Sequence, residues 1–260
     1  MAEEGGTDYD LIEVVNCCFQ GIKSRRIERE MSMPKMPDDA EPMLSSAYVL
    51  HAKEEAQEAN SYLLTKRVID VLFSALCLFL LLPLFAVIAV LIKLDDPKGK
   101  VFFRQTRIGK DEKPFEMYKF RSMIANAEEL KKNLMAYNEV SGAMFKMKND
   151  PRITRVGRFL RKTSIDELPQ LWNVLVGNMS LVGPRPPLPD EVAQYTEYDK
   201  KRLTVTPGCT GYWQVTGRNS VGFEEMVELD LTYIQMRSTK LDFKIIVKTV
   251  LILFGSKNAY

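Results

Sequence analysis

The sequence predicts a mainly helical α+β fold for a monotopic membrane protein, with an N-terminal re-entrant membrane helix, interfacial amphipathic helices and a small cytosolic domain. Three observations predict it. An uncharged apolar run covers residues 71–92, arginines recur every three residues from Arg152 to Arg161, and two short segments, 101–103 and 115–120, resemble β-strands. The chain is therefore divided into a polar extension (1–60), the membrane helix (61–97) and the cytosolic domain (98–260).

Composition limits the classes of protein to which the chain can belong. With 260 residues and 29.8 kDa it can bury one substantial core, and its net charge of +2 argues against a protein that coats nucleic acid. The four cysteines form no Cys-x-x-Cys pair, and the N-terminus lacks a secretory-signal pattern, so a reduced, cytosol-facing location is expected. Since the only histidine, His51, is far from every motif below, carboxylates are the default reactive groups.

Residues 1–60 are polar and mixed in composition. They contain a helical pattern from Asp10 to Met31 and a proline-punctuated link at 33–39. A regulatory or packing extension and a poorly ordered tail are both compatible with this pattern, and the sequence does not predict the role of the segment.

The run at 71–92 is long enough to cross a bilayer, and a simple span is one interpretation. Pro83 instead favours a kink, because it removes one helical hydrogen bond. Basic residues flank both ends and favour keeping both on the cytoplasmic side: Lys66 and Arg67 before the run, and Lys93, Lys98 and Lys100 after it. We therefore predict a re-entrant helix with its break near Pro83, and we expect Asp70 at the membrane surface beside Lys66 and Arg67.

The chain from residue 98 onward has the pattern of a domain that lies on a membrane surface. The arginines at 152, 155, 158 and 161 alternate with apolar residues and predict a basic amphipathic helix, suited to anionic headgroups or substrate phosphates. A solvated charged face is the alternative. Residues 241–254 are apolar but interrupted by Lys244 and Lys248, which fits an interfacial helix and a core helix equally well.

The segment 163–173 is the most informative for chemistry. An apolar helical face and the placement of Pro169 in a first turn predict a helix whose cap lies around residues 164–166; the face consists of Leu168, Leu171, Trp172 and Leu175. The carboxylates of Asp166 and Glu167 would then meet the positive end of the helix dipole.

These two carboxylates have a structural and a functional interpretation. Ser164-x-x-Glu167 is a formal capping box, and an aspartate near a cap is ordinary. In the functional interpretation, one carboxylate attacks phosphorus and the other binds a divalent cation that neutralises phosphates. The spacing alone leaves both open.

Two loops add candidates for binding. The Gly-Pro-Arg-Pro turn at 183–186 holds Arg185 in a rigid loop that suits bidentate phosphate recognition, although an incidental surface arginine is the commoner finding. The stretch 207–214, followed by Gly217-Arg218-Asn219, has aromatic and polar side chains that could stack a base and hold a sugar, or could belong to the core.

At these residues the sequence resembles the bacterial sugar transferase family, the monotopic polyprenyl-phosphate sugar-1-phosphate transferases that start capsule, exopolysaccharide or glycan assembly. The likeness covers about residues 65–260. Its motifs are the Lys-Arg-Val-Ile-Asp run at 66–70, residues 101–105 with Arg107 and Gly109, residues 118–123 and 149–154, the Asp166-Glu167 stretch and the loop at 183–186.

The resemblance implies a two-step transfer at the bacterial inner membrane, with the catalytic domain in the cytoplasm. Asp166 would attack the β-phosphorus of a UDP-sugar, expel UMP and hold the sugar-1-phosphate as an acyl phosphate, which undecaprenyl phosphate would then collect. Glu167, with Asp166, would bind Mg²⁺. The side chains expected to bind substrate phosphates are Lys119, Arg121, Arg161, Arg185, Gln105 and Arg218. A homodimer is compatible with the sequence.

The chain departs from the family pattern at three places. Leu82 precedes the membrane proline where many relatives have Ser, so a hydroxyl that could satisfy the broken backbone is missing. Lys100 replaces a proline before the first strand, and residues 1–60 have no counterpart in the minimal family core. Residues 207–219 resemble the branch of the family that handles hexose-1-phosphates such as glucose or galactose.

Two other functions use the same residues. A membrane-bound scaffold would bind anionic lipid through the arginines from 152 to 161, and both carboxylates would then be helix caps. A metal-dependent hydrolase of nucleotide-sugars would use the carboxylates with water as acceptor. The membrane segment counts against the hydrolase, because soluble substrates do not require the interface.

Overall fold

The computed structural model describes residues 41–127, 129–130, 147, 150–216 and 222–255. Residue contacts divide the chain into two units, Met1–Glu58 and Ala59–Tyr260. Only the beginning of helix α2 is described in the first unit, and the other described elements belong to the second. The helical pattern expected at Asp10–Met31 and the candidate ligand Arg218 lie outside the described residues.

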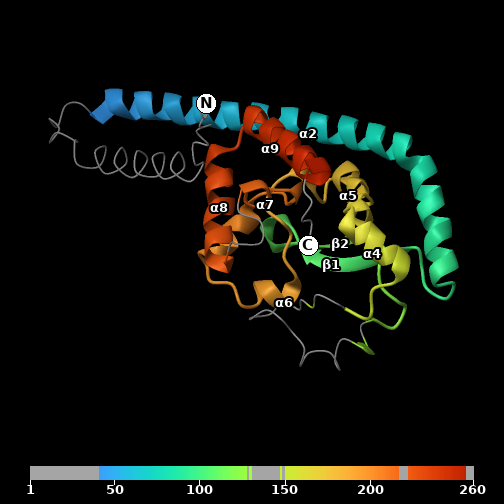
Figure 1. Ribbon diagram of the computed structural model, residues 1–260. Helices are drawn as coiled ribbons and strands as arrows, with labels where there is room; N and C mark the ends of the chain where they lie inside the picture. Colours follow the sequence, from blue (N-terminus) through green and yellow to red (C-terminus); the bar gives the residue numbers. More distant parts are fainter. Residues whose placement is uncertain (1–40, 128, 131–146, 148–149, 217–221, 256–260) are drawn as a thin grey trace, which may run out of the picture. The chain divides into compact units, whose positions relative to one another are not determined.

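Helix α2 (Glu41–Asp95) contains the apolar run and continues through Pro83. Its part Asn60–Asp95 is the one helix in the described chain that is long and apolar enough to cross a membrane. Figure 1 shows that α2 changes direction before it leads into β1. The bend is explained by Pro83, which leaves the carbonyl of Phe79 without its usual helical donor. Apolar side chains such as Phe79 (72% exposed) face outward.

The part of α2 before Pro83, its first limb, contacts the C-terminal half of the chain. The ammonium of Lys66 lies 2.6 Å from a carboxylate oxygen of Asp242. The guanidinium of Arg67 donates to the carbonyls of Val174 at 2.6 Å and Leu175 at 2.9 Å. Because those carbonyls end a helix, Arg67 acts as its C-terminal cap.

Asp70 lies near Lys66, as expected, but its side chain is buried within the domain. Its side chain is only 4% exposed, and it accepts the backbone N–H of Leu181 at 3.0 Å. A buried carboxylate needs such a donor, so α2 is fixed to the strand that contains Leu181.

The limb of α2 after Pro83 returns to the same domain. The carboxylate of Asp95 accepts the backbone N–H of Val156 at 2.9 Å. Ile88 and Ile92, each 3% exposed, form a second hydrophobic cluster with Phe120 and Leu160. Both limbs are therefore held by one domain, and the apolar segment between them projects from it.

The domain contains two small sheets. Strands β1 (Phe102–Ile108) and β2 (Pro114–Phe120) pair antiparallel over their whole length, and the 3-10 turn η1 (Lys110–Glu112) connects them. Strands β3 (Ser180–Val182) and β4 (Gly208–Thr210) pair in parallel. The strand expected at 101–103 extends to Ile108, because pairing with β2 carries it through polar residues that show no apolar alternation.

Short helices surround these sheets, so the described chain is mainly helical with some strands, as predicted. They are α4 (Arg155–Lys162), η3 (Ile165–Glu167), α5 (Gln170–Val176), α6 (Pro189–Val192), η4 (Asp199–Thr204), α7 (Tyr212–Thr216), α8 (Phe223–Met236) and α9 (Thr239–Gly255). Arg152 is not part of the predicted basic helix. It precedes α4, is 4% exposed and is ion-paired with Asp150.

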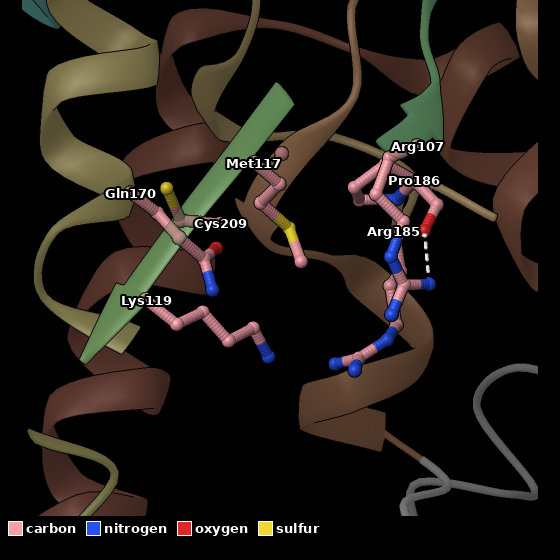
Figure 2. A pocket seen from close by; sticks show the side chains of 8 residues that line it. Arg107, Met117, Lys119, Gln170, Arg185, Pro186 and Cys209 are labelled. Atoms are coloured by element: carbon pink, nitrogen blue, oxygen red, sulfur yellow. Dashed lines mark hydrogen bonds between the residues drawn. The ribbon is translucent and has the colours of Figure 1, made fainter. Parts of the chain in front are cut away.

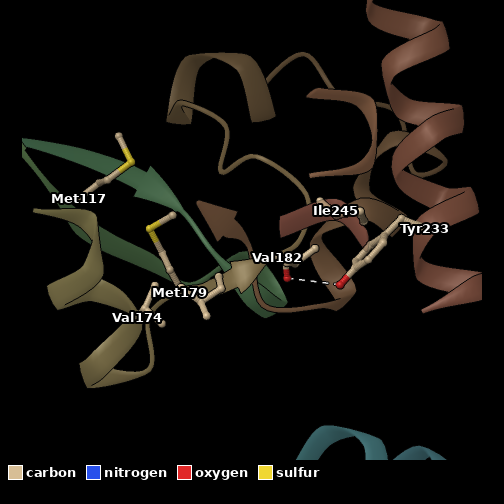
Figure 3. Close-up of a cluster of buried hydrophobic side chains, with 7 residues drawn as sticks. Met117, Val174, Met179, Val182, Tyr233 and Ile245 are labelled. Atoms are coloured by element: carbon tan, nitrogen blue, oxygen red, sulfur yellow. Dashed lines mark hydrogen bonds between the residues drawn. The ribbon is translucent and has the colours of Figure 1, made fainter. Parts of the chain in front are cut away.

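The main core joins the sheets to α5, α8 and α9. Figure 3 shows its buried side chains, which are Met117, Val174, Met179, Leu181, Val182, Tyr233 and Ile245. Helix α9 belongs to the core through one face and exposes apolar side chains on another: Ile245 is 1% exposed, whereas Phe243 and Leu251 are 67% and 64% exposed. This amphipathic arrangement fits a helix that lies at an apolar interface.

Asn173 fixes α5 to β2. Its side-chain oxygen accepts the backbone N–H of Tyr118 at 3.0 Å, and its amide nitrogen donates to the carbonyl of Glu116 at 2.7 Å. These are the groups of β2 that point away from β1, so the amide takes the place of a third strand. The side chain is fully buried.

We expect Asn173→Leu to lower the free energy of unfolding by about 2–4 kcal/mol, because it leaves a buried N–H and a buried C=O without partners. Thermal unfolding in detergent measures the effect. Asn178→Ala, at an exposed position of the following turn, is the matched control and should change stability by less than about 0.5 kcal/mol. Equal stability of the two variants would contradict this role.

Candidate active site

The two carboxylates lie at a tight turn between α4 and α5. Ser164 adopts a left-handed conformation (φ 55°) and makes no side-chain cap bond. Glu167 directs its Oε1 to the ammonium of Lys119, 2.6 Å away. The capping box is therefore not formed. A left-handed serine costs about 1 kcal/mol, which is typical of residues held in place at functional sites.

The predicted helix start also needs a correction. The 3-10 turn η3 contains both carboxylates, and α5 begins only at Gln170, after Pro169. The predicted apolar face of α5 is not its buried face: Trp172 is 49% exposed, whereas Gln170 and Val174 are buried. The reason is the polar anchor to β2 described above, which turns the side chain of Asn173 inward.

The adjacent carboxylates have opposite electrostatic environments. Burial, followed by the neighbouring charge of Glu167, raises the pKa of Asp166 to about 6, against the lowering effects of Lys119 and Arg161. Burial also acts on Glu167, but Lys119 and Arg185 prevail and lower its pKa to about 2. At neutral pH Glu167 is thus a permanent anion, and Asp166 is a carboxylate whose ionisation is only just favoured.

A pocket borders this pair. Its lining residues are Arg107, Met117, Lys119, Gln170, Arg185, Pro186, Gly208 and Cys209. Figure 2 shows the side chains of Lys119 and Arg185 extending toward the same space from β2 and from the loop after β3. Since the ammonium of Lys119 also contacts Glu167, the pocket and the carboxylates form one site. Three cations around one pocket suit a ligand that carries several phosphate charges.

Arg107 has the least exposed side chain of the three cations. It is 8% exposed and donates to the carbonyl of Pro186 at 3.0 Å and to the side-chain oxygen of Gln105 at 2.8 Å. Burial and the nearby charge of Arg185 lower its pKa to about 10, and burial likewise lowers the pKa of Lys119. Gln105 therefore supports Arg107 and is not part of the described pocket lining.

The structure separates the predicted ligands into two groups. Lys119 and Arg185 line the pocket, and Arg161, in the last turn of α4, is close enough to Asp166 to lower its pKa. Arg121 is placed elsewhere: its guanidinium is packed against Gly99 and donates to the carbonyl of Asp96 at 2.7 Å. It holds the end of the membrane helix and does not line the pocket.

The sequence analysis did not identify Arg107, Met117 or Gln170 as pocket residues, whereas Cys209 lies in the candidate loop 207–214. Gln170 follows Glu167 by three residues, and this helical spacing could have placed it on the same side as the carboxylate. Arg107 had no such signal, because its position depends on the pairing of β1 with β2. Burial strongly raises the pKa of the Cys209 thiol, so this side chain is an inert wall of the pocket.

The carboxylates offer a partial site for a divalent cation. The described residues contain no group of three or more metal-ligating side chains. Two adjacent carboxylates nevertheless fit Mg²⁺, which commonly takes one or two carboxylates together with substrate phosphates. The donor set of Asp166 and Glu167 thus fits Mg²⁺ that arrives with a phosphate ligand.

The chain is similar in sequence to known bacterial sugar transferases. A sequence profile described as bacterial sugar transferase matches residues 61–256. The chain is 45% identical over 200 residues to the galactosyl transferase CpsE of Streptococcus agalactiae, covering 75% of this chain and 44% of CpsE.

Two further relatives have similar identities. The undecaprenyl-phosphate galactose phosphotransferase of Salmonella typhimurium is 43% identical over 199 residues, 75% of this chain and 41% of the relative. The UDP-glucose:undecaprenyl-phosphate glucose-1-phosphate transferase of Escherichia coli is 42% identical over 205 residues, 76% of this chain and 42% of the relative. The chain spans less than half the length of each of these relatives. The profile match at 61–256 contains the whole pocket and both carboxylates.

Proposed function

The chain belongs to the bacterial sugar transferase family, and on that premise we propose that it transfers a hexose-1-phosphate from a UDP-sugar to undecaprenyl phosphate, with release of UMP. The observation that carries the proposal is the pair Asp166 and Glu167, with oppositely shifted pKa values, beside a pocket lined by three cations. Relatives named for galactose and glucose transfer favour a hexose as the sugar.

In the first step, a carboxylate oxygen of Asp166 attacks the β-phosphorus of the donor. The bond from this phosphorus to the bridging oxygen breaks, and UMP leaves with the electron pair, so that an acyl phosphate that carries the sugar remains on Asp166. The leaving phosphate needs no proton, because its second pKa is close to 6. Lys119, Arg107 and Arg185 stabilise the charge that develops on the phosphate oxygens.

In the second step, an oxygen of undecaprenyl phosphate attacks the same phosphorus. The acyl phosphate bond breaks, the carboxylate of Asp166 is restored, and the sugar leaves on a lipid diphosphate. A buried nucleophile suits this sequence, because exclusion of water protects the acyl phosphate from hydrolysis; Asp166 is 8% exposed.

Mg²⁺ completes the proposed site. Glu167, with Asp166, would hold it, and it would supply charge neutralisation for the donor diphosphate. Glu167 is suited to this role because it is anionic throughout the physiological pH range. Its present partner, Lys119, is a pocket residue that can contact donor phosphate when the cation is bound.

The membrane helix is proposed to enter the bilayer and return on the same side. The contacts of Lys66 and Arg67 before Pro83 and of Asp95 after it bind one domain. A straight span would place these two ends on opposite sides of the membrane, where one domain could not bind both. The exposed apolar side chains around the bend, such as Phe79 and Leu80, then face lipid. The catalytic domain faces the cytoplasm, where nucleotide-sugars are made.

Cysteine labelling tests this topology. Single cysteines at Gly5 and Glu225, in a background without native cysteines, should react with a membrane-impermeant maleimide only from the cytoplasmic side of the membrane. Glu225 is exposed on α8. Accessibility of the two positions from opposite sides would show a spanning helix and overturn the re-entrant arrangement.

Product analysis tests the proposed reaction. Purified protein in nanodiscs is supplied with Mg²⁺, undecaprenyl phosphate and one of a panel of radiolabelled UDP-sugars. We expect one hexose donor to place label in the organic phase as a lipid diphosphate, with an equal amount of UMP in the aqueous phase. Label that remains aqueous as free sugar-1-phosphate would instead identify a hydrolase.

The pH dependence of turnover follows from the pKa of Asp166. Only the ionised carboxylate attacks phosphorus, so kcat/KM should fall about tenfold per pH unit below a pKa near 6 and be level above it. Rates measured from pH 5 to 8 check this profile, and a level kcat/KM across this range would contradict the assignment.

A further inference from the structure

The loop that presents Arg185 is held through its carbonyl groups. Pro184, Pro186 and Pro187 have no backbone N–H, so this stretch has few donors of its own. Four consecutive carbonyls, of residues 184–187, each accept a hydrogen bond. The donors are the N–H of Gly208 at 2.9 Å, the guanidinium of Arg202 at 3.3 Å, the guanidinium of Arg107 at 3.0 Å and the N–H of Ile108 at 3.0 Å.

Among these donors, Arg202 is the one that binds the carbonyl of Arg185 itself. Arg202 lies on η4, is 2% exposed and does not line the pocket. Its Nη2 atom donates to this carbonyl and is ion-paired with Asp230 of α8, while its Nη1 atom donates to the hydroxyl of Tyr195 at 2.9 Å. Asp230 is fully buried.

The buried ion pair between Arg202 and Asp230 joins η4 to α8, but it contributes little net stability for two buried charges. The desolvation of both charges offsets much of their attraction, and apolar residues of similar size often stabilise a fold as well or better. The planar guanidinium does something that an apolar side chain cannot: it directs donors to three acceptors in fixed directions. One of these acceptors belongs to the residue that presents a phosphate-binding cation.

We propose that Arg202, oriented by Asp230, is a positioning residue for Arg185. It fixes the carbonyl of Arg185 and thereby sets where the guanidinium of Arg185 meets the diphosphate of the donor. This inference rests on the proposed function, and it assigns a role to two buried residues outside the pocket.

A double-mutant cycle tests the proposal, with Arg202→Lys and Arg185→Lys made singly and together. Lysine keeps the charge of residue 202 but cannot reach all three acceptors. We expect Arg202→Lys to lower kcat/KM for UMP release, and the affinity for UDP, by roughly 10- to 100-fold in the native background. With Arg185→Lys already present, the same substitution should cost less than about threefold, because the group that it positions is gone.

Two further variants separate positioning from folding. Asp230→Asn keeps the shape of the side chain but removes the charge that orients Arg202, and it should reproduce the loss seen with Arg202→Lys. Glu228→Gln is the matched control: its carboxylate accepts the hydroxyl of Tyr198 and thus joins α8 to the start of η4 on the exposed surface. It should change both readouts less than about twofold.

The outcomes distinguish the inference from the proposed function. Equal losses from Arg202→Lys in both backgrounds, or no loss in either, would overturn the positioning role. A wild type that binds UDP but releases no UMP would overturn the proposed function, while the cycle in UDP affinity would still decide the role of Arg202. A wild type that binds no UDP would overturn both.

Discussion

Asp166→Asn is expected to abolish transfer, with kcat reduced by on the order of 10⁴-fold. The amide has almost the same shape as the carboxylate but cannot form the acyl phosphate. Release of UMP and formation of lipid-linked sugar should be lost together, because both require this covalent step. Asp190→Asn, at an exposed carboxylate of α6, is the matched control and should leave both products unchanged.

The same variant should be as stable as the wild type or more stable. The folded-state pKa of Asp166 is raised to about 6, so the fold favours the neutral form, and ionisation above pH 6 costs stability. Asparagine removes this cost, and we expect a gain of about 1–3 kcal/mol at pH 7.5 that disappears below about pH 4. Thermal unfolding at the two pH values measures it. Full activity of Asp166→Asn would contradict the assignment of Asp166 as the nucleophile, and a marked loss of stability at pH 7.5 would contradict its raised pKa.

Lys119→Met is expected to lower kcat/KM by about 100- to 1,000-fold. Methionine keeps most of the length and the apolar stem of the side chain, but it removes the ammonium that contacts Glu167 and faces the pocket. Two effects then add: the donor phosphates lose a cation, and the pKa of Glu167 rises because its nearest positive charge is gone.

Steady-state rates for three variants separate these effects. Lys119→Arg keeps the charge and should retain more activity than Lys119→Met, although the larger guanidinium fits the buried site poorly. Lys113→Met, at an exposed lysine of the same hairpin, is the matched control and should be fully active. A Lys119→Met enzyme within about threefold of the wild type would show that the pocket is not the donor site.

The parts of the site that could be predicted from sequence are those fixed by local chemistry. The Asp166-Glu167 pair, the Arg185 loop and the apolar run with Pro83 each lie within a few consecutive residues, and their residue types already limit what they can do. Even there, the local turn could not be predicted, because the left-handed Ser164 and the bond from Glu167 to Lys119 replace the capping box that the spacing suggests.

The parts that could not be predicted depend on contacts between distant segments. Arg121 and Arg107 are similar in sequence context, since both are arginines in the polar stretch around the hairpin. One binds the carbonyl of Asp96 at the end of the membrane helix, and the other binds the carbonyl of Pro186 beside the pocket. Only the register of β1 with β2 and the return of α2 to the domain decide which arginine lines the pocket.

Buried polar residues were the hardest to interpret from sequence. Trp172 was expected on the apolar face of its helix, yet it is 49% exposed, whereas its neighbour Asn173 is fully buried. Asp70 was expected beside Lys66 and Arg67, and its buried carboxylate also accepts the backbone N–H of Leu181. In both cases a polar side chain is buried because a distant backbone group needs a partner, which hydrophobic periodicity does not reveal.

The most direct test of the account is a single-turnover measurement of UMP release in the absence of the lipid acceptor. The proposed two-step mechanism predicts a burst of at most one UMP per enzyme with the preferred UDP-hexose and Mg²⁺, label retained on the protein at Asp166, and continuous turnover only after undecaprenyl phosphate is added. Continuous UMP release without lipid, or no UMP release from any UDP-sugar by folded protein, would contradict it.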